Sequence, residues 1–157
     1  MVFYRTTEQQ EVLLQALMRD ARRTNRSLAQ EVRLAPSTTL QRVRDLEANG
    51  TITGYHAAVD LAALGRNVEA MVFVRLRPKT DEVVNDFLDY VWAMPEVIAV
   101  HLVSGAEDAL VHVAVPDTES LRRAVLRQIS DHHAVVDERT TLVFEHRRKH
   151  VIEPLES

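Results

Sequence analysis

A segment in the first third of the chain combines arginines with short polar side chains at helical spacing. We expect a helix to begin at Pro36, because proline is tolerated at the first helical position, and to end at Gly50, which supplies a left-handed cap. Placing successive residues about 100° apart puts Leu40, Val43 and Leu46 on one stripe, which we expect to be buried. The opposite face is then available to a ligand.

That opposite face carries the chemistry of DNA recognition. Short polar side chains can reach base edges in a major groove, while arginines on the shoulders of the helix and on the preceding helix can meet phosphates. The predicted DNA-contacting residues are Arg22, Arg23, Arg26, Ser37, Thr38, Thr39, Gln41, Arg42, Arg44 and Asp45. Two short helices joined by a tight connection, with this face on the second, are typical of a helix-turn-helix.

The charge distribution supports this interpretation. Residues 22–44 hold six arginines against one acid, Glu31, whereas the whole chain has a net charge of -4. Residues 1–50 hold eight basic and six acidic residues, and residues 51–157 hold eleven and seventeen. The basic patch can neutralise DNA phosphates, and the contrast between the halves predicts two domains with different partners.

Several kinds of site are not expected. The chain has no cysteine, which excludes disulfides, a thiolate nucleophile and cysteine-ligated metals. No His, Asp and Glu group has a convincing ligand spacing, so we expect no metal and no cofactor, and we interpret His132 and His133 as a solvated cap after a helix. No apolar run is long enough for a membrane span, and residues 1–10 lack the pattern of a signal peptide, so we expect a cytoplasmic protein without a membrane partner.

The remaining elements divide the chain into three parts. Two helices, capped by Thr6 or Thr7 and by Thr24 or Asn25, complete a DNA-binding domain over residues 1–50. Residues 51–66 are predicted to be a linker with a short strand and a helical turn, and residues 67–157 a second domain.

The second domain shows the pattern β-α-β-β-α-β. The expected strands are 68–76, 97–103, 108–115 and 135–144, and the expected helices are 81–94 and 117–130. This order predicts a ferredoxin-like sheet of four antiparallel strands with two helices on one face. The fold class is therefore α+β, a winged-type helix-turn-helix followed by a ferredoxin-like domain.

The strands are apolar on both faces although only two helices are available to cover them. A second copy of the sheet is the simplest cover, so we expect a homodimer. His101 and His112 should lie opposite or diagonal on adjoining strands and point toward this dimer face. We interpret them as a hydrogen-bonded interface pair, with a pH sensor, a metal contact or an effector contact as alternatives.

The order and spacing of several segments resemble the Lrp/AsnC family of transcription regulators over nearly the full length. The matching segments are Arg22-x-Thr24, Leu28-Ala29, Leu34-x-Pro36, Arg42-Val43-Arg44, Leu46-Glu47, Gly50-x-Ile52, Gly54-Tyr55-x-Ala57, Leu64-Gly65 and Val103-Ser104-Gly105-x-x-Asp108. The resemblance implies a C-terminal domain of the RAM type that dimerises, further assembly to octamers or discs, and small effectors, usually amino acids, bound between protomers.

Carried onto this chain, the resemblance implies an effector site at the Gly-x-x-Asp loop. The candidate residues are His101, Ser104, Gly105, Ala106, Glu107, Asp108, Thr140 and Thr141. Glycine lets backbone amides approach a carboxylate, and an acid can pair with an α-ammonium group, so the two ends of an amino acid would both be met.

Three positions depart from the family pattern. Arg33 stands where the family usually has glycine, and Ala35 where it usually has a serine helix cap. Glu107 replaces the aromatic residue common in amino-acid responders, and this second carboxylate could favour a basic amino acid.

The sequence thus predicts a non-enzymatic, sequence-specific regulator that binds double-stranded DNA and responds to a small effector. One alternative is an effector-independent DNA-compacting protein of the same fold. Another is an enzyme similar to sirohaem decarboxylases, with His101, His112 and Arg75 at the substrate. The basic helix-turn-helix would then have no function in the protein.

Overall fold

The computed structural model describes residues 6–155 and groups them in two compact units. Residues 6–58 form the first unit together with residues 147–155, and Val59–His146 form the second. This grouping joins the segment after the last strand to the N-terminal helices, and residues 59–66 to the sheet. The sequence pattern did not indicate either assignment, because both depend on contacts between distant parts of the chain.

Three helices build the first unit: α1 (Glu8–Arg19), α2 (Asn25–Glu31) and α3 (Pro36–Ala48). Thr7 caps α1 in a reciprocal capping box with Gln10, and the Thr24 hydroxyl accepts from the Ser27 N–H at the start of α2. The apolar stripes of α1 and α2 meet in a small core made of Leu13, Ala16, Leu28 and Val32. Both caps lie at positions that the sequence predicted.

The buried stripe of α3 is rotated from the one expected. Leu46 is buried and Val43 partly buried, but Thr39 is fully buried while Leu40 is 39% exposed. Thr39 and Val43 are four residues apart and Val43 and Leu46 three, which places all three on one helix face. The Thr39 hydroxyl donates to the Ala35 carbonyl oxygen at 3.1 Å, so its polar atom is satisfied inside the helix. Thr39 is therefore wrongly placed among the predicted DNA contacts.

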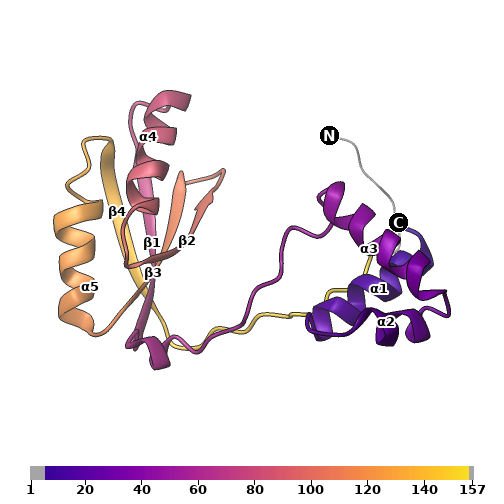
Figure 1. Cartoon of the computed structure of the whole chain (residues 1–157). Coiled ribbons are helices and arrows are strands. Elements are labelled where there is room, and N and C mark those ends of the chain that lie inside the picture. Colours follow the sequence, from indigo (N-terminus) through magenta and orange to yellow (C-terminus); the bar gives the residue numbers. More distant parts are fainter. Residues whose placement is uncertain (1–5, 156–157) are drawn as a thin grey trace. The chain divides into compact units, whose positions relative to one another are not determined.

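The second unit is the expected α+β arrangement (Figure 1). Its strands are β1 (Val68–Leu76), β2 (Val97–Leu102), β3 (Ala109–Val115) and β4 (Val135–Val143), which form one antiparallel sheet in the order β2-β3-β1-β4. Its helices are α4 (Asp81–Trp92) and α5 (Thr118–Ala124), and α5 continues into a π-helical turn, η2 (Val125–Ile129). A short 3₁₀ turn, η1 (Ala62–Leu64), precedes the sheet and ends at Gly65 with φ +74°.

Fully buried and partly buried side chains alternate along β1, so this sheet has two distinct faces. Ala70, Val72, Val74 and Leu76 are fully buried and pack with buried residues of α4 and α5. Met71 and Phe73 alternate with them and point to the other side, which we call the open face. The core of this unit is thus one-sided, as expected for a ferredoxin-like domain seen as a single copy.

His132 corrects another expectation. It is buried rather than part of a solvated cap, and its ring packs against Phe87 and Tyr90 of α4 with ring centroids 5.2 and 4.9 Å apart. His133 remains exposed. The sequence pattern showed that these residues follow a helix but not that α4 covers the turn.

No helix within residues 6–155 is long and apolar enough to cross a membrane.

Candidate DNA interface and effector site

The outer face of α3 presents polar side chains to solvent. Ser37, Thr38, Gln41 and Asp45 are all exposed. The Gln41 side-chain amide donates to the Asp45 carboxylate at 2.8 Å, one helical turn away. This contact orients the Gln41 amide, whose donor and acceptor atoms are of the kind that read adenine in a major groove.

The arginines around this face differ in their surroundings. Arg22, Arg26 and Arg44 are exposed, and Arg42 is half-buried. Arg23 is instead held inside the first unit, where it pairs with Glu31 and donates to the Ser27 hydroxyl at 2.8 Å. Glu31 therefore offsets part of the basic patch and fixes Arg23 against α2.

The turn between α2 and α3 determines how α3 is presented. The Arg33 N–H donates to Gln30, and the Leu34 N–H donates to Ala29, which together form a Schellman cap. Arg33 occupies the left-handed position of this cap, with φ +54°. The Asn25 side-chain amide also donates to the Pro36 carbonyl oxygen at 2.8 Å, and so ties the start of α2 to the start of α3.

The loop between β2 and β3 is the predicted effector loop. Ser104, Gly105 and Ala106 are exposed, and Gly105 has φ +135°, which L side chains rarely adopt. The Arg75 guanidinium donates to the Ala106 carbonyl oxygen at 3.3 Å. Glu107 is paired with Arg139 of β4 at 3.7 Å. Two arginines of neighbouring strands thus hold this loop.

Asp108 closes the loop and is nearly buried. Its carboxylate accepts from the Leu76 N–H at 2.9 Å and lies 2.6 Å from the Lys79 ammonium and 3.7 Å from the Arg77 guanidinium. Burial by itself raises the pKa of Asp108, but the hydrogen bonds from Lys79 and Leu76 and the two cationic charges outweigh it, so the pKa is lowered. The carboxylate is therefore ionised and already paired within the protomer.

The strand histidines lie on the open face as expected. His101 is opposite Leu110, and His112 is opposite Ala99, so the two histidines are diagonal neighbours. His112 is largely buried, with Nε2 at 3.0 Å from Glu69 Oε2 and its ring centroid 6.0 Å from that of His146. The register places Arg75 and His112 on either side of the row that contains His101.

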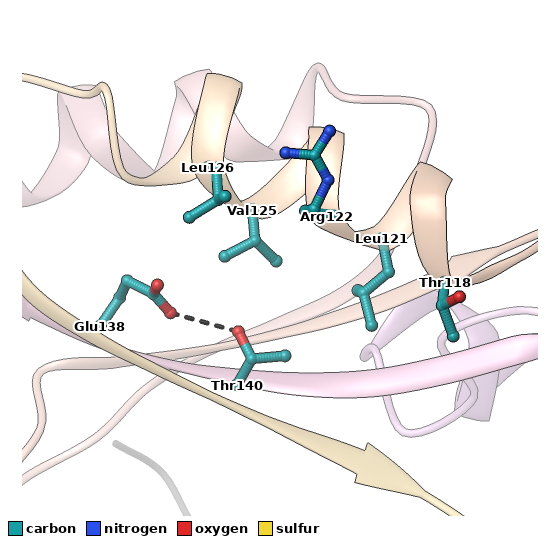
Figure 2. Close-up of a pocket in the computed structure, with 7 residues that line it drawn as sticks. All are labelled: Thr118, Leu121, Arg122, Val125, Leu126, Glu138 and Thr140. Atoms are coloured by element: carbon teal, nitrogen blue, oxygen red, sulfur yellow. Dashed lines mark hydrogen bonds between the residues drawn. The ribbon is translucent and has the colours of Figure 1, made fainter.

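The two candidate threonines of β4 lie on different faces. Thr141 is opposite Met71 on the open face, whereas Thr140 is opposite Val72 on the helix-covered face. Thr140 lines a groove of about 270 Å³ between β4 and α5, beside Glu138 and below Leu121 and Val125 (Figure 2). A single protomer therefore does not bring all the predicted effector residues together.

Two family models match the chain. A winged helix-turn-helix DNA-binding model matches residues 7–53, and the model of the Lrp/AsnC ligand binding domain matches residues 69–151, more than half of the chain. The chain belongs to the Lrp/AsnC family. This assignment agrees with the helix-turn-helix and the ferredoxin-like sheet that the structure contains.

Relatives of this Lrp/AsnC chain are transcriptional regulators. The HTH-type transcriptional regulator AldR of Mycolicibacterium smegmatis is 38% identical over 87% of this chain and 80% of its own length. The leucine-responsive regulatory protein of Escherichia coli K12 is 33% identical over 85% of this chain and 81% of its own length. A transcriptional regulator from Neisseria meningitidis, whose structure is that of an L-Met complex, has a TM-score of 0.84 and 27% identity over 92% of this chain and 94% of that one.

The sequence pattern did not indicate several residues that organise these sites. Asn25 and Glu31 position the DNA-binding helices, and Lys79 pairs with Asp108. Lys79 is one of only two lysines in the chain and directly follows Pro78, but its partner lies far away in sequence. Asp86 beside His132 and His133 was missed for the same reason.

Proposed function

We propose that this Lrp/AsnC regulator binds double-stranded DNA in a sequence-specific manner through the outer face of α3. The observation that carries the proposal is the exposure of Ser37, Thr38 and Gln41 beside Arg44, on a helix whose other face is packed in the first unit. Polar side chains would read base edges, and arginines would neutralise phosphates.

Two substitutions test this docking of α3. Replacing Arg42 with alanine should weaken binding to every duplex and reduce the salt dependence of binding by about one counterion, because a phosphate contact is lost. Replacing Gln41 with alanine should mainly change which base is preferred. Both are measured by fluorescence anisotropy over a range of salt concentrations.

Arg127→Ala is the matched control, because Arg127 is an exposed arginine of the other unit. It should leave both the affinity and the salt slope unchanged. Normal DNA binding by Arg42→Ala would show that α3 does not dock as proposed.

The open face of the sheet supports a homodimer as the working form of the regulator. Met71, Phe73 and Leu110 form an apolar strip across β1 and β3 on the side away from the helix-packed core. A second copy would cover this strip, and the same pairing would present two recognition helices to two DNA half-sites.

We further propose that the effector is an amino acid bound near residues 104–108 where two protomers meet. The Neisseria regulator in its L-Met complex supports this class of ligand. Because Arg139 already pairs with Glu107, the structure adds no support to a preference for basic amino acids, so we propose the class alone. Binding would change DNA affinity by favouring one packing of the protomers over another.

A further inference from the structure

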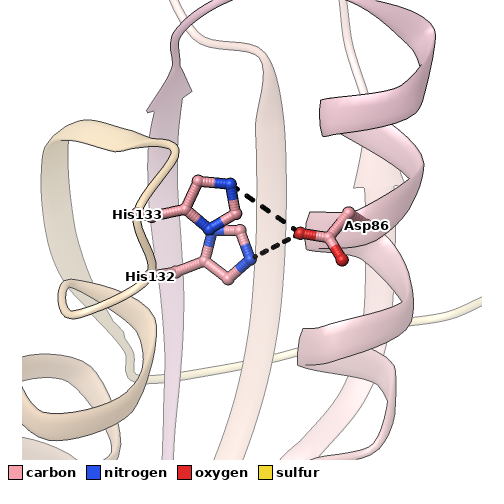
Figure 3. A group of neighbouring side chains, drawn as sticks. All are labelled: Asp86, His132 and His133. Atoms are coloured by element: carbon pink, nitrogen blue, oxygen red, sulfur yellow. Dashed lines mark ion pairs between the residues drawn. The ribbon is translucent and has the colours of Figure 1, made fainter.

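Three potential metal ligands meet on the surface of the second unit, far from the effector loop in sequence. Asp86 lies on α4, and His132 and His133 lie in the turn between η2 and β4. His132 Nε2 is 3.3 Å from Asp86 Oδ2, and His133 Nε2 is 4.0 Å from the same oxygen. Figure 3 shows both imidazole rings turned toward this one carboxylate.

The three side chains differ in how exposed they are and in how tightly they are packed. The His132 side chain is only 6% exposed and is held by Phe87 and Tyr90, whereas those of Asp86 and His133 are 59% and 70% exposed. One ligand is thus fixed by packing, and the other two can adjust around an ion arriving from solvent. A buried anchor beside two exposed ligands also leaves room for water in a fourth position.

The distances suit a tetrahedral ion. With metal–nitrogen and metal–oxygen bonds of about 2.1 Å, the ligand atoms of a tetrahedral Zn²⁺ site are about 3.4 Å apart. The His132 to Asp86 distance already meets that requirement. All three ligand atoms lie within 4.8 Å of one another. A rotation of the exposed His133 ring can bring its nitrogen to the separation of about 3.4 Å that a tetrahedral site requires.

We propose that Asp86, His132 and His133 form a binding site for a divalent transition-metal ion such as Zn²⁺, with water as the fourth ligand. Two imidazoles and one carboxylate are a donor set that Zn²⁺ accepts and that Mg²⁺ and Ca²⁺ do not favour. The ion would join α4 to the turn that leads into β4. This site revises the expectation of no metal, which rested on spacing along the sequence.

The protonation of His132 affects the strength of the site. Burial, with a smaller effect of His133, lowers the pKa of His132 despite the opposing carboxylate of Asp86, which favours the neutral ring that a metal requires. The Ala134 N–H lies 3.3 Å from His132 Nδ1, so Nε2 carries the proton in the metal-free ring. Binding through Nε2 moves that proton to Nδ1 and breaks the Ala134 contact, so we expect weaker binding than at a site where the second ring nitrogen donates to an acceptor.

Calorimetric titration of Zn²⁺ into the full-length protein, after treatment with a chelator, tests this site at neutral pH. The wild type should bind one ion per chain at this site. Asp86→Asn and His133→Gln should each weaken that binding tenfold or more. Both residues are exposed, and thermal unfolding without metal checks that the variants remain folded.

Asp89→Asn and His150→Gln are the matched controls. Asp89 is an exposed aspartate on the same helix, and His150 is an exposed histidine of the other unit. Both should keep the wild-type affinity. Absence of Zn²⁺ binding by the wild type, or equal binding by Asp86→Asn, His133→Gln and the controls, would overturn the proposal.

Discussion

Asp108 connects the effector loop to the end of β1 through one backbone N–H and two cationic side chains. The Leu76 N–H, the Lys79 ammonium and the Arg77 guanidinium all face its carboxylate, whose side chain is only 11% exposed. A nearly buried charge of this kind is stable only because it is paired and hydrogen-bonded. At the residue scale, Asp108 therefore acts as a structural anchor for the loop.

Replacing Asp108 with asparagine should lower the free energy of unfolding by about 2 kcal/mol at neutral pH, because charge-assisted hydrogen bonds are lost. The pKa of Asp108 is lowered in the folded protein. Its stabilising effect is therefore complete above the ordinary carboxyl pKa and is lost as the pH falls through the lower, folded value. Urea unfolding at a series of acidic pH values should show a smaller loss of stability in the variant than in the wild type.

Glu119→Gln is the control for that series, because Glu119 forms an exposed pair with Arg122 on α5. It should change stability much less than Asp108→Asn. Identical acid profiles for wild type and Asp108→Asn would contradict the role given to this carboxylate.

At the element scale, the turn between α2 and α3 has neither a glycine at its left-handed position nor a hydrogen-bonding side chain at the N-cap of α3. Arg33 has φ +54° in a cap position where glycine is preferred. Ala35 is the N-cap of α3 and makes no side-chain hydrogen bond there. The turn is held instead by backbone hydrogen bonds and by the Asn25 contact to Pro36.

Replacing Arg33 with glycine should raise the free energy of unfolding by about 0.5 to 1 kcal/mol, because the left-handed conformation then carries no steric cost. Arg33→Ala is the matched variant: it removes the charge but keeps a Cβ at positive φ. Denaturant unfolding should therefore rank Arg33→Gly above the wild type, with Arg33→Ala no more stable than the wild type. An equal gain in both variants would assign the effect to charge rather than to backbone strain.

Replacing Ala35 with serine should supply the missing cap. The serine hydroxyl would accept a backbone N–H in the first turn of α3 and stabilise the first unit by about 1 kcal/mol. Thermal unfolding measures the gain. An unchanged or lower unfolding temperature would show that the start of α3 does not need a side-chain cap.

Local features of the fold could be predicted, and features that depend on distant contacts could not. The caps at Thr7 and Thr24 follow from residue type and position. The order of helices and strands along the chain follows from apolar patterning. The sequence pattern did not predict that Thr39 faces the interior of the first unit or that His132 is buried. The first depends on how α3 packs on its neighbours, and the second on α4, whose residue Phe87 lies 45 positions before His132.

At the scale of the whole molecule, the open face of the sheet is the proposed dimer interface. The row formed by His101, Leu110, Phe73 and Arg139 crosses all four strands, and the Arg139 guanidinium lies 4.8 Å from the centre of the Phe73 ring. A second copy on this face would bury Phe73 and bring two effector loops to the edges of one interface. Dimerisation and effector response would then be linked by geometry.

Replacing Phe73 with aspartate should convert the proposed dimer to a monomer, because a charge would be buried in an apolar interface. Sedimentation analysis measures the change. Trp92→Asp is the control, since Trp92 is 67% exposed at the end of α4 and should leave the assembly unchanged. A Phe73→Asp variant that remains folded and dimeric would show that the open face is not the interface.

Fluorescence anisotropy on duplexes tiled across the upstream region of the protein's own gene tests sequence-specific, effector-dependent DNA binding directly. Binding is measured against random competitor DNA, with and without each common amino acid. We expect saturable, competitor-resistant binding to a subset of duplexes, with an affinity that an amino acid shifts. Binding no stronger than to the competitor would contradict a sequence-specific regulator, and specific binding that no amino acid shifts would contradict the proposed effector class.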